Sequence, residues 1–236
     1  WQEIEQAMGG PAPDVFIRVL RNCGALKLIL PEVDRLFGVP QPVKYHPEVD
    51  TGLHILLCLQ QAAKLTDDPV VRYAALVHDV GKGVTDKAKW PSHYAHETLG
   101  LPLQADISKR LHVPNEFSKL AALVCEHHTK LHRIKELRPA KLLKLIEALD
   151  GFRRPEHVQK FLLACEADAK GRTGLEERDY PQNTYLTTIL NELSQLDLGA
   201  LLKQAKPKNT QEFVQQSRLN LLSDILTRLK ISEAAN

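Results

Sequence analysis

The residues that most clearly indicate chemistry are an adjacent histidine and aspartate, His78 and Asp79, which follow the apolar run Ala74-Ala75-Leu76-Val77. Burying an imidazole and a carboxylate at the end of an apolar helix costs free energy unless both groups find partners. A divalent metal ion would be a partner for both, because neutral imidazole and carboxylate are ligands of borderline and hard cations. The pair therefore indicates a metal site, with a buried ion pair at a helix end as the simpler alternative.

Other segments supply further candidate ligands. His54 lies among Leu53, Ile55 and Leu56, where a lone histidine would ordinarily be a core residue, and its partnership with the His78-Asp79 pair is the reason to assign it a function. A late aspartate would complete the set, and Asp150 and Asp168 compete for that place because both end apolar helical runs. We favour Asp168. The predicted metal ligands are His54, His78, Asp79 and Asp168, which would leave two positions of an octahedral ion open for water and substrate.

Hydrolysis of a phosphate ester needs a lowered water pKa, neutralised phosphoryl oxygens and a fixed line of attack, and a metal held in this way supplies all three. His96 and His127 are expected in a second tier, where they would hold a second metal, bind phosphate or protonate the leaving oxygen. Of the adjacent histidines at 127 and 128 one must turn away, and we favour His127 as the functional one. Lys82 is expected to reach a non-bridging phosphate oxygen. The predicted catalytic residues are His78, Asp79, His96, His127 and Lys82, and the histidines treated as surface or supporting residues are His46, His93, His112, His132 and His157.

The elements that position these residues all read as helices, because apolar residues recur with helical spacing almost throughout and alternating strand-like runs are absent. Asp50 or Thr51 is expected to cap a helix that carries His54 to about residue 64. Asp68, followed by Pro69, is expected to cap the helix that delivers the His78-Asp79 pair. Further helices are predicted over residues 14–23, 96–111, 114–128, 139–149, 155–170, 184–196 and 210–229. The sequence therefore predicts an all-α fold.

Composition narrows the class of protein. The chain has 236 residues, of which 43% are hydrophobic, so a sizeable core can form. No run of eighteen apolar residues predicts a membrane span. Its four cysteines are scattered singly without a C-x-x-C pair, which indicates buried thiols in a reducing cytoplasm. The chain begins at Trp1 and has its only methionine at Met8, so we expect a piece of a longer protein.

The formal net charge is only +2, but it is unevenly distributed. Between residues 127 and 160, Lys and Arg outnumber Asp and Glu by nine to four. Such a segment is either a surface that attracts phosphate groups of RNA or the solvated face of two helices. We favour the RNA surface, and the residues expected to bind RNA are Lys130, Arg133, Arg153, Arg154 and Arg172.

The order His54, His78-Asp79, His96, His127 and a late aspartate resembles the HD superfamily of metal-dependent phosphohydrolases. The surrounding segments resemble more specifically the C-terminal half of bacterial CCA-adding tRNA nucleotidyltransferases that carry an HD domain. The segments that carry this similarity are Leu20-Arg21-Asn22-Cys23-Gly24-Ala25-Leu26, Leu30-Pro31-Glu32-Val33, His46-Pro47-Glu48-Val49-Asp50-Thr51, Phe152-Arg153-Arg154-Pro155-Glu156 and the stretch from Ala164 to Arg172. The similarity covers nearly the whole chain and is weaker after Tyr180.

The resemblance implies an HD-type helical bundle over residues 46–172, preceded by a helical neck or body segment over 1–45 and followed by a helical tail over 173–236. It also implies 2′,3′-cyclic phosphodiesterase, 2′-nucleotidase and phosphatase activities supported by nickel or magnesium, with manganese as a further possibility. The expected partners are tRNA and small 2′,3′-cyclic or 2′-phosphorylated nucleotides, and we expect a cytoplasmic monomer or homodimer with no membrane association.

In that family, CCA addition belongs to an N-terminal head with a Gly-Ser turn and an Asp-x-Asp site. The sequence contains neither, nor the Glu-Asp-x-x-Arg nucleotide-selecting helix, so we do not expect the chain to add CCA by itself. Two alternatives stay open. One is a helical tRNA-binding scaffold with a silent metal site, and the other is a nucleoside-triphosphate hydrolase of the HD superfamily, for which the sequence shows no triphosphate pocket.

Overall fold

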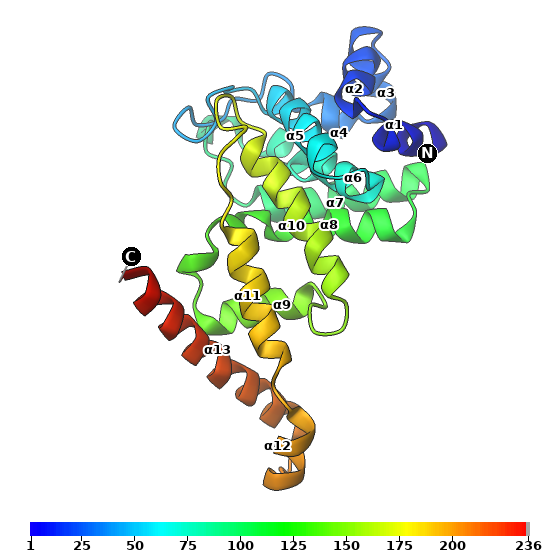
Figure 1. The fold of residues 1–236 in the computed structure, drawn as a ribbon. Helices are drawn as coiled ribbons and strands as arrows, with labels where there is room; N and C mark the ends of the chain where they lie inside the picture. The colour runs from blue at the N-terminus through cyan, green and yellow to red at the C-terminus, as the bar shows by residue number, and fades with distance from the viewer. Residues whose placement is uncertain (235–236) are drawn as a thin grey trace. The chain divides into compact units, whose positions relative to one another are not determined.

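The computed structural model describes residues 1–234, and within them the chain is all-α, as predicted (Figure 1). Thirteen α-helices and three short 3₁₀ helices are present in this range. The same range contains no β-strand, and one isolated antiparallel β-bridge pairs Pro40 with Asp50. The described chain divides into two compact units. The first contains residues 1–132 and 159–180, and the second contains residues 133–158 and those from 181 onward.

The first unit is built mainly from long helices in the middle of the chain. Its helices are α1 (Gln2–Gly9), α2 (Pro13–Asn22), α3 (Leu26–Ile29), α4 (Pro31–Asp34), α5 (Thr51–Leu65), α6 (Pro69–Val77), η1 (Val80–Val84), η2 (Lys87–Lys89), α7 (His96–Leu111), α8 (Asn115–His132) and most of α10 (Pro155–Lys170). Helix α6 packs between α5 and α8, and α7 packs against α8 and η1. The core of the unit therefore lies around α6.

The predicted helix starts on either side of the core are confirmed. Asp50 caps α5, since its carboxylate accepts a hydrogen bond from the backbone of Leu53 at 2.9 Å. Asp68 caps α6 by accepting from the backbone of Val70, with Pro69 in the first turn. Helix α6 then ends at Val77, so that His78 and Asp79 follow directly on its buried end.

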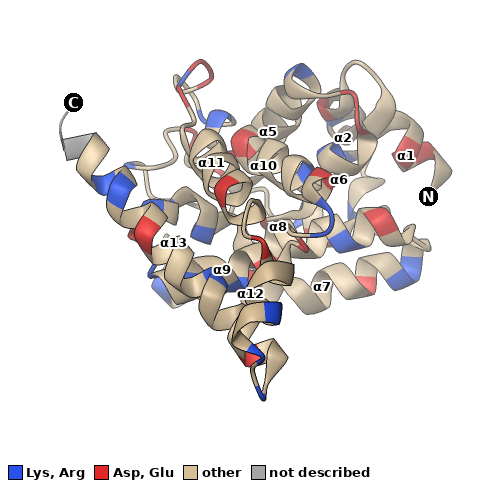
Figure 2. Ribbon diagram, turned by 60° about the horizontal axis from the view of Figure 1, so that its bottom comes forward, with Lys and Arg blue, Asp and Glu red and all other residues tan. Residues whose placement is uncertain are grey.

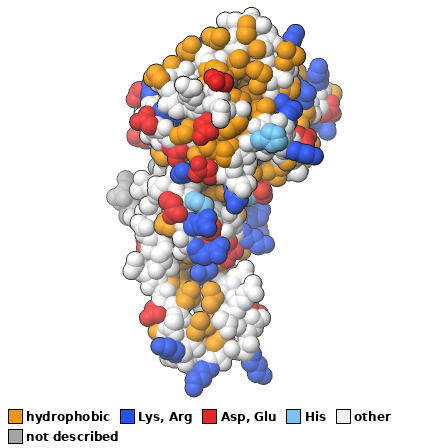
Figure 3. Space-filling model, turned by 90° about the vertical axis from the view of Figure 1, so that its right-hand side faces the viewer, with side chains coloured by type: hydrophobic (Ala, Val, Ile, Leu, Met, Phe, Trp, Pro, Cys, Tyr) orange, Lys and Arg blue, Asp and Glu red, His pale blue; other side chains and the backbone are white. Residues whose placement is uncertain are grey.

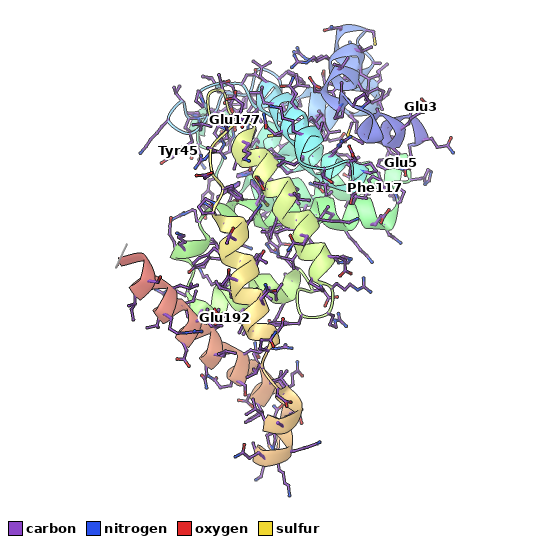
Figure 4. The ribbon with its side chains drawn as sticks, in the orientation of Figure 1. Glu3, Glu5, Tyr45, Phe117, Glu177 and Glu192 are labelled. Atoms are coloured by element: carbon purple, nitrogen blue, oxygen red, sulfur yellow. The ribbon has the colours of Figure 1, made fainter. Side chains whose placement is uncertain are left out.

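The N-terminal segment is part of the same unit. Trp1 packs edge-to-face on Tyr73 of α6 and on Phe117 of α8, with ring centroids 5.1 and 4.9 Å apart. The indole nitrogen of Trp1 donates to Glu5 of α1 at 2.7 Å; Glu5 and Phe117 are labelled in Figure 4. Residues 1–45 thus share a compact unit with the helices that follow them.

The second unit contains η3 (Ile134–Glu136), α9 (Pro139–Ala148), α11 (Gln182–Ser194), α12 (Leu198–Ala205) and α13 (Thr210–Ala234). Helix α13 packs along α9 and α11, and the guanidinium of Arg218 lies over the ring of Phe152. The compact units therefore divide the chain at different places from the boundaries expected after residues 45 and 172.

Several helices differ from the sequence prediction. Helix α8 runs four residues beyond the expected end at residue 128, to His132. Helix α12 occupies a stretch for which no helix was predicted, because its eight residues are too few for a periodic pattern, although Asp197 caps it at the backbone of Ala200. Within residues 1–234, no helix has both the length and the apolar character that crossing a membrane requires.

Candidate metal centre

A cluster of imidazole and carboxylate groups lies at the heart of the first unit. Its six members come from five helices or helix ends, and all are buried. The members are His54 of α5, His78 and Asp79 after α6, His96 at the start of α7, His128 of α8 and Asp168 of α10. Residues far apart in the sequence are therefore brought together because α5, α8 and α10 pack on α6, while α7 packs on α8 and η1.

The four predicted metal ligands are together in this cluster. His54 Nε2 is 3.1 Å from Asp168 Oδ1 and 3.9 Å from Asp79 Oδ2. His78 Nε2 is 3.3 Å from Asp79 Oδ2 and 3.7 Å from Asp168 Oδ2. Asp150, the competing aspartate, lies in the other compact unit and pairs with Arg153 at 2.6 Å, so the structure brings Asp168 to the site.

Three imidazoles of the cluster, those of His78, His96 and His128, each direct Nδ1 at a backbone carbonyl. The Nδ1 atom of His78 donates to the carbonyl of Ala75 at 2.9 Å, that of His96 to His93 at 2.8 Å, and that of His128 to Val124 at 2.9 Å. Because a carbonyl oxygen can only accept, these contacts place the proton on Nδ1 and leave the Nε2 lone pair free. All three Nε2 atoms face the carboxylates, which is the arrangement that metal-binding histidines adopt.

The cluster also contains buried polar atoms that the protein does not satisfy. His78 Nε2 and both carboxylate oxygens of Asp79 are buried without a hydrogen bond, although the ammonium of Lys82 lies 2.7 Å from Asp79 Oδ2. Unsatisfied polar atoms are costly in a protein interior, and a metal ion would satisfy all three. The residues therefore fit a divalent cation.

The electrostatics of the cluster favour charged carboxylates. Burial alone would raise the pKa of Asp79, but Lys82 and His78 hold it well below its usual range. Burial likewise opposes ionisation of Asp168, yet His132 and His78 keep its pKa well below the usual range. Burial, with the neighbouring His78, lowers the pKa of His128, which keeps this imidazole neutral. Ionised carboxylates beside a neutral imidazole are the protonation states that metal ligands need.

His96, which was expected in a second tier, contacts Asp79 of the cluster directly, whereas His127 lies outside the cluster. His96 Nε2 is 3.3 Å from Asp79 Oδ1 and 3.4 Å from His128 Nε2. The ring of His127 instead contacts Lys130, whose Nζ is 2.9 Å from Nδ1. Successive residues of a helix point about 100° apart, so only one of the two can face the cluster, and the packing of α8 selects His128 over the expected His127.

The side chain of Lys82 is buried and is held by contacts with Asp79 and Gln41. Its Nζ lies 2.7 Å from Asp79 Oδ2 and donates to Gln41 Oε1 at 2.6 Å, and the side chain is 9% exposed. Gln41 was not among the predicted site residues, and its Nε2 is buried without a hydrogen bond. The Lys82 ammonium therefore neutralises Asp79 from within the site.

Three further residues contact the site, and of these only His132 was singled out from the sequence, as a surface or supporting residue. His132 Nε2 is 2.6 Å from Asp168 Oδ2, and its Nδ1 is 2.8 Å from the Tyr180 hydroxyl. Glu48 Oε1 is 3.0 Å from His54 Nδ1, and Cys58 Sγ is 3.4 Å from His54 Nε2. The spacing of four residues between His128 and His132, and between His54 and Cys58, was a usable signal, since such residues share a helix face.

The residues expected to bind RNA are distributed over both units. Lys130 and Arg172 belong to the first unit, and Arg172 contacts the cluster, with Nη2 3.4 Å from Asp168 Oδ1. In the second unit Arg133 pairs with Glu136, and Arg153 and Arg154 both pair with Asp150. Figure 2 shows Lys and Arg together with Asp and Glu on α13, and the face in Figure 3 has the same mixture. The basic residues are therefore interspersed with acidic ones.

Known proteins resemble this chain over most of its length. Residues 51–152 match the family model described as HD domain. This matched region includes five members of the cluster and ends before Asp168. The chain is 50% identical over 206 residues to the Multifunctional CCA protein of Teredinibacter turnerae, which covers 87% of the chain and 50% of the relative.

Proteins of the same name from two other bacteria are similar. That of Ectopseudomonas mendocina is 49% identical over 223 residues, covering 94% of the chain and 54% of the relative. That of Pseudomonas aeruginosa strain LESB58 is 53% identical over 186 residues, and the match covers 79% of the chain and 45% of the relative. The chain thus spans about half the length of these relatives, and the resemblance inferred from the sequence segments is confirmed.

Proposed function

The chain belongs to the HD superfamily of metal-dependent phosphohydrolases, and from this premise we propose that its buried cluster hydrolyses 2′,3′-cyclic phosphodiesters and 2′-phosphorylated nucleotides. The observation that carries the proposal is the set of Nε2 atoms and carboxylate oxygens gathered around Asp79. A scaffold that only binds RNA would have no need of such a buried and unsatisfied donor set.

His54, His78, Asp79 and Asp168 would hold the divalent ion, for which nickel, magnesium and manganese are the candidates. Once bound, the ion supplies the positive charge that acidifies water and polarises the phosphoryl group. The mixed nitrogen and oxygen donors are compatible with each of these metals, with imidazole favouring nickel and carboxylate favouring magnesium and manganese.

The protein groups around these ligands have separate tasks. His96 is the cluster imidazole with the most exposed side chain, at 10%, whereas those of His54 and His128 are 0% and 3% exposed. It is therefore the group placed to pass a proton to a leaving oxygen. Lys82 keeps a positive charge beside Asp79, where it would offset negative charge on a phosphoryl oxygen.

We propose tRNA as the macromolecular partner because the relatives are named for CCA and the chain resembles CCA-adding tRNA nucleotidyltransferases. Arg153 and Arg154 are the best placed of the proposed RNA-binding residues, since their side chains are 82% and 58% exposed. A cytoplasmic location and a monomeric or homodimeric state remain part of the same proposal. The boundaries proposed for the HD bundle are 46–172.

The test is hydrolysis of 2′,3′-cyclic AMP by the purified chain with nickel, magnesium or a chelator. We expect metal-dependent turnover that is lost in Asp79→Ala and kept in Asp106→Ala, which removes an exposed aspartate of α7. Absence of turnover with every metal, in folded protein that binds tRNA, would support the scaffold instead. Faster turnover of nucleoside triphosphates than of the cyclic substrate would support a triphosphate hydrolase.

A further inference from the structure

We infer that Glu48 is a positioning residue for the metal ligand His54, holding its ring and strengthening its Nε2 atom as a donor. The inference rests on the proposed metal centre. Glu48 lies in the loop that precedes α5, outside every helix and outside the matched HD-domain region. Its role is to act through His54, without touching the substrate.

The contact between the two residues is short and fully enclosed. Glu48 Oε1 lies 3.0 Å from His54 Nδ1, and the side chains are 3% and 0% exposed. On the opposite side of the ring, His54 Nε2 faces Asp168 at 3.1 Å. A carboxylate on Nδ1, with Nε2 directed at the proposed metal ligand Asp168, corresponds to the carboxylate–histidine–metal arrangement that orients a ligand and raises its basicity.

Hydrogen-bond satisfaction alone does not explain the carboxylate. His54 Nδ1 already lies 2.9 Å from the carbonyl oxygen of Gly171, which is enough to accept its proton. Glu48 adds a buried negative charge, and its second oxygen, Oε2, is buried without a hydrogen bond. Burying a carboxylate that is only partly satisfied is costly, so its benefit must be the charge that it places on His54.

His46 is a second histidine in contact with the Glu48 carboxylate. Its Nδ1 also lies 3.0 Å from Glu48 Oε1, and its ring packs edge-to-face on that of His54 with centroids 4.7 Å apart. The three residues offer atoms close enough to hold an ion of their own. A metal there would, however, displace the Nδ1 proton that His54 shares with Gly171, so positioning is the better account of the geometry.

The loop is built to hold Glu48 in place. Asp50 anchors it at both ends, accepting from the backbone of Gly38 at 2.6 Å and from that of Leu53 at 2.9 Å. Val49, which lies between Glu48 and Asp50 in the sequence, has a φ of 60°. This left-handed conformation is unfavourable for a β-branched residue. Such strain persists only where the surroundings enforce it, and here it turns the chain so that Glu48 meets His54.

The test uses Glu48→Gln, which keeps the size and a hydrogen-bond acceptor but removes the charge, with Glu116→Gln on the exposed start of α8 as the matched control. Nickel affinity is measured by calorimetry for the full chain, and thermal unfolding is measured with a chelator present. We expect nickel to bind about 10- to 100-fold more weakly to Glu48→Gln, and the control to match the wild type. The metal-free Glu48→Gln protein should unfold at or somewhat below the wild-type temperature, since the amide pairs less strongly than the carboxylate with His46 and His54.

Each other outcome overturns a specific statement. Equal nickel affinity in wild type and Glu48→Gln would overturn the positioning role while leaving the metal centre standing. A lower metal-free unfolding temperature with unchanged affinity would make Glu48 a structural residue only. Two nickel ions bound to the wild type and one to Glu48→Gln would assign Glu48 to a separate metal site with His46. A wild type that binds no divalent ion would overturn the proposed function as well, and metal binding without turnover would overturn the hydrolase alone.

Discussion

The Nε2 atom of His128 lies 3.6 Å from Oδ1 of Asp79, across the packed faces of α6 and α8. His96 Nε2 approaches the same oxygen at 3.3 Å. On the other side of the carboxylate, Oδ2 faces His54, His78 and Lys82. The two oxygens of Asp79 thus divide the cluster into two groups, one formed by α7 and α8 and the other by α5 and the end of α6.

This division predicts different consequences for the adjacent histidines of α8. We expect His128→Ala to weaken metal binding or turnover at least about tenfold, because it removes an imidazole directed at Asp79. We expect His127→Ala to change both by less than about twofold, since its ring contacts Lys130 outside the cluster. Nickel calorimetry and turnover of 2′,3′-cyclic AMP measure the difference. A larger loss in His127→Ala would reverse the assignment.

Metal loading should stabilise the protein through the same cluster. An ion that binds only the folded state adds about 2.7 kcal/mol at a concentration of 100 times its Kd. We expect nickel to raise the unfolding temperature of the wild type and to leave that of Asp168→Asn nearly unchanged, because the variant loses a charged ligand. Calorimetric unfolding with and without a chelator checks this. An equal rise in both proteins would place the ion elsewhere.

Because η1 lies close to α7, we expect a single added methyl group at Gly81 to destabilise the folded protein. A Cβ atom at Gly81 would lie 2.0 Å from the carbonyl oxygen of His96 and 2.7 Å from the backbone nitrogen of Gly100. Neither backbone group can yield easily, so we expect Gly81→Ala to lower the free energy of unfolding by about 3 kcal/mol. It should also lower the turnover of 2′,3′-cyclic AMP by displacing His96, the proposed proton donor.

The matched control is Gly9→Ala at the end of α1, where a Cβ would meet nothing within 4 Å. It should leave the free energy of unfolding unchanged or raise it by up to about 1 kcal/mol, since alanine favours a helix. Urea unfolding of the two variants gives the comparison. Equal stability of Gly81→Ala and wild type would show that η1 and α7 are not held this closely.

The proposed RNA surface is tested by changing Arg153 and Arg154 together to alanine. Both arginines are exposed. Their ion pairs with Asp150 lie at the surface, and such pairs contribute little to the free energy of unfolding. We expect weaker tRNA binding and a decrease of about one in the salt slope for each phosphate contact removed. Arg18→Ala, on α2 of the other compact unit, is the control. A salt slope that does not change would remove these two arginines from the interface.

Local signals in the sequence were sufficient for much of the fold. The caps at Asp50 and Asp68 and the apolar run before His78 depend only on neighbouring residues, and each is found as predicted. The short helices of the N-terminal segment and α12 were not predicted, because four to eight residues contain too few turns for a periodic pattern. Their positions depend on packing, as the contacts of Trp1 with α6 and α8 illustrate.

The amino-acid sequence was enough to establish the helical class, the HD pairing and a set of candidate ligands, since residue type and spacing express local chemistry directly. The choice of His128 over His127 required the rotation of α8 about its axis, which is set by the side chains that pack against it. Asp168 was already favoured over Asp150 from the sequence, and the tertiary structure adds that Asp168 lies against His54 while Asp150 belongs to the other compact unit. Glu48 and His132 became part of the site only through contacts across long stretches of chain, and no local pattern encodes those distances.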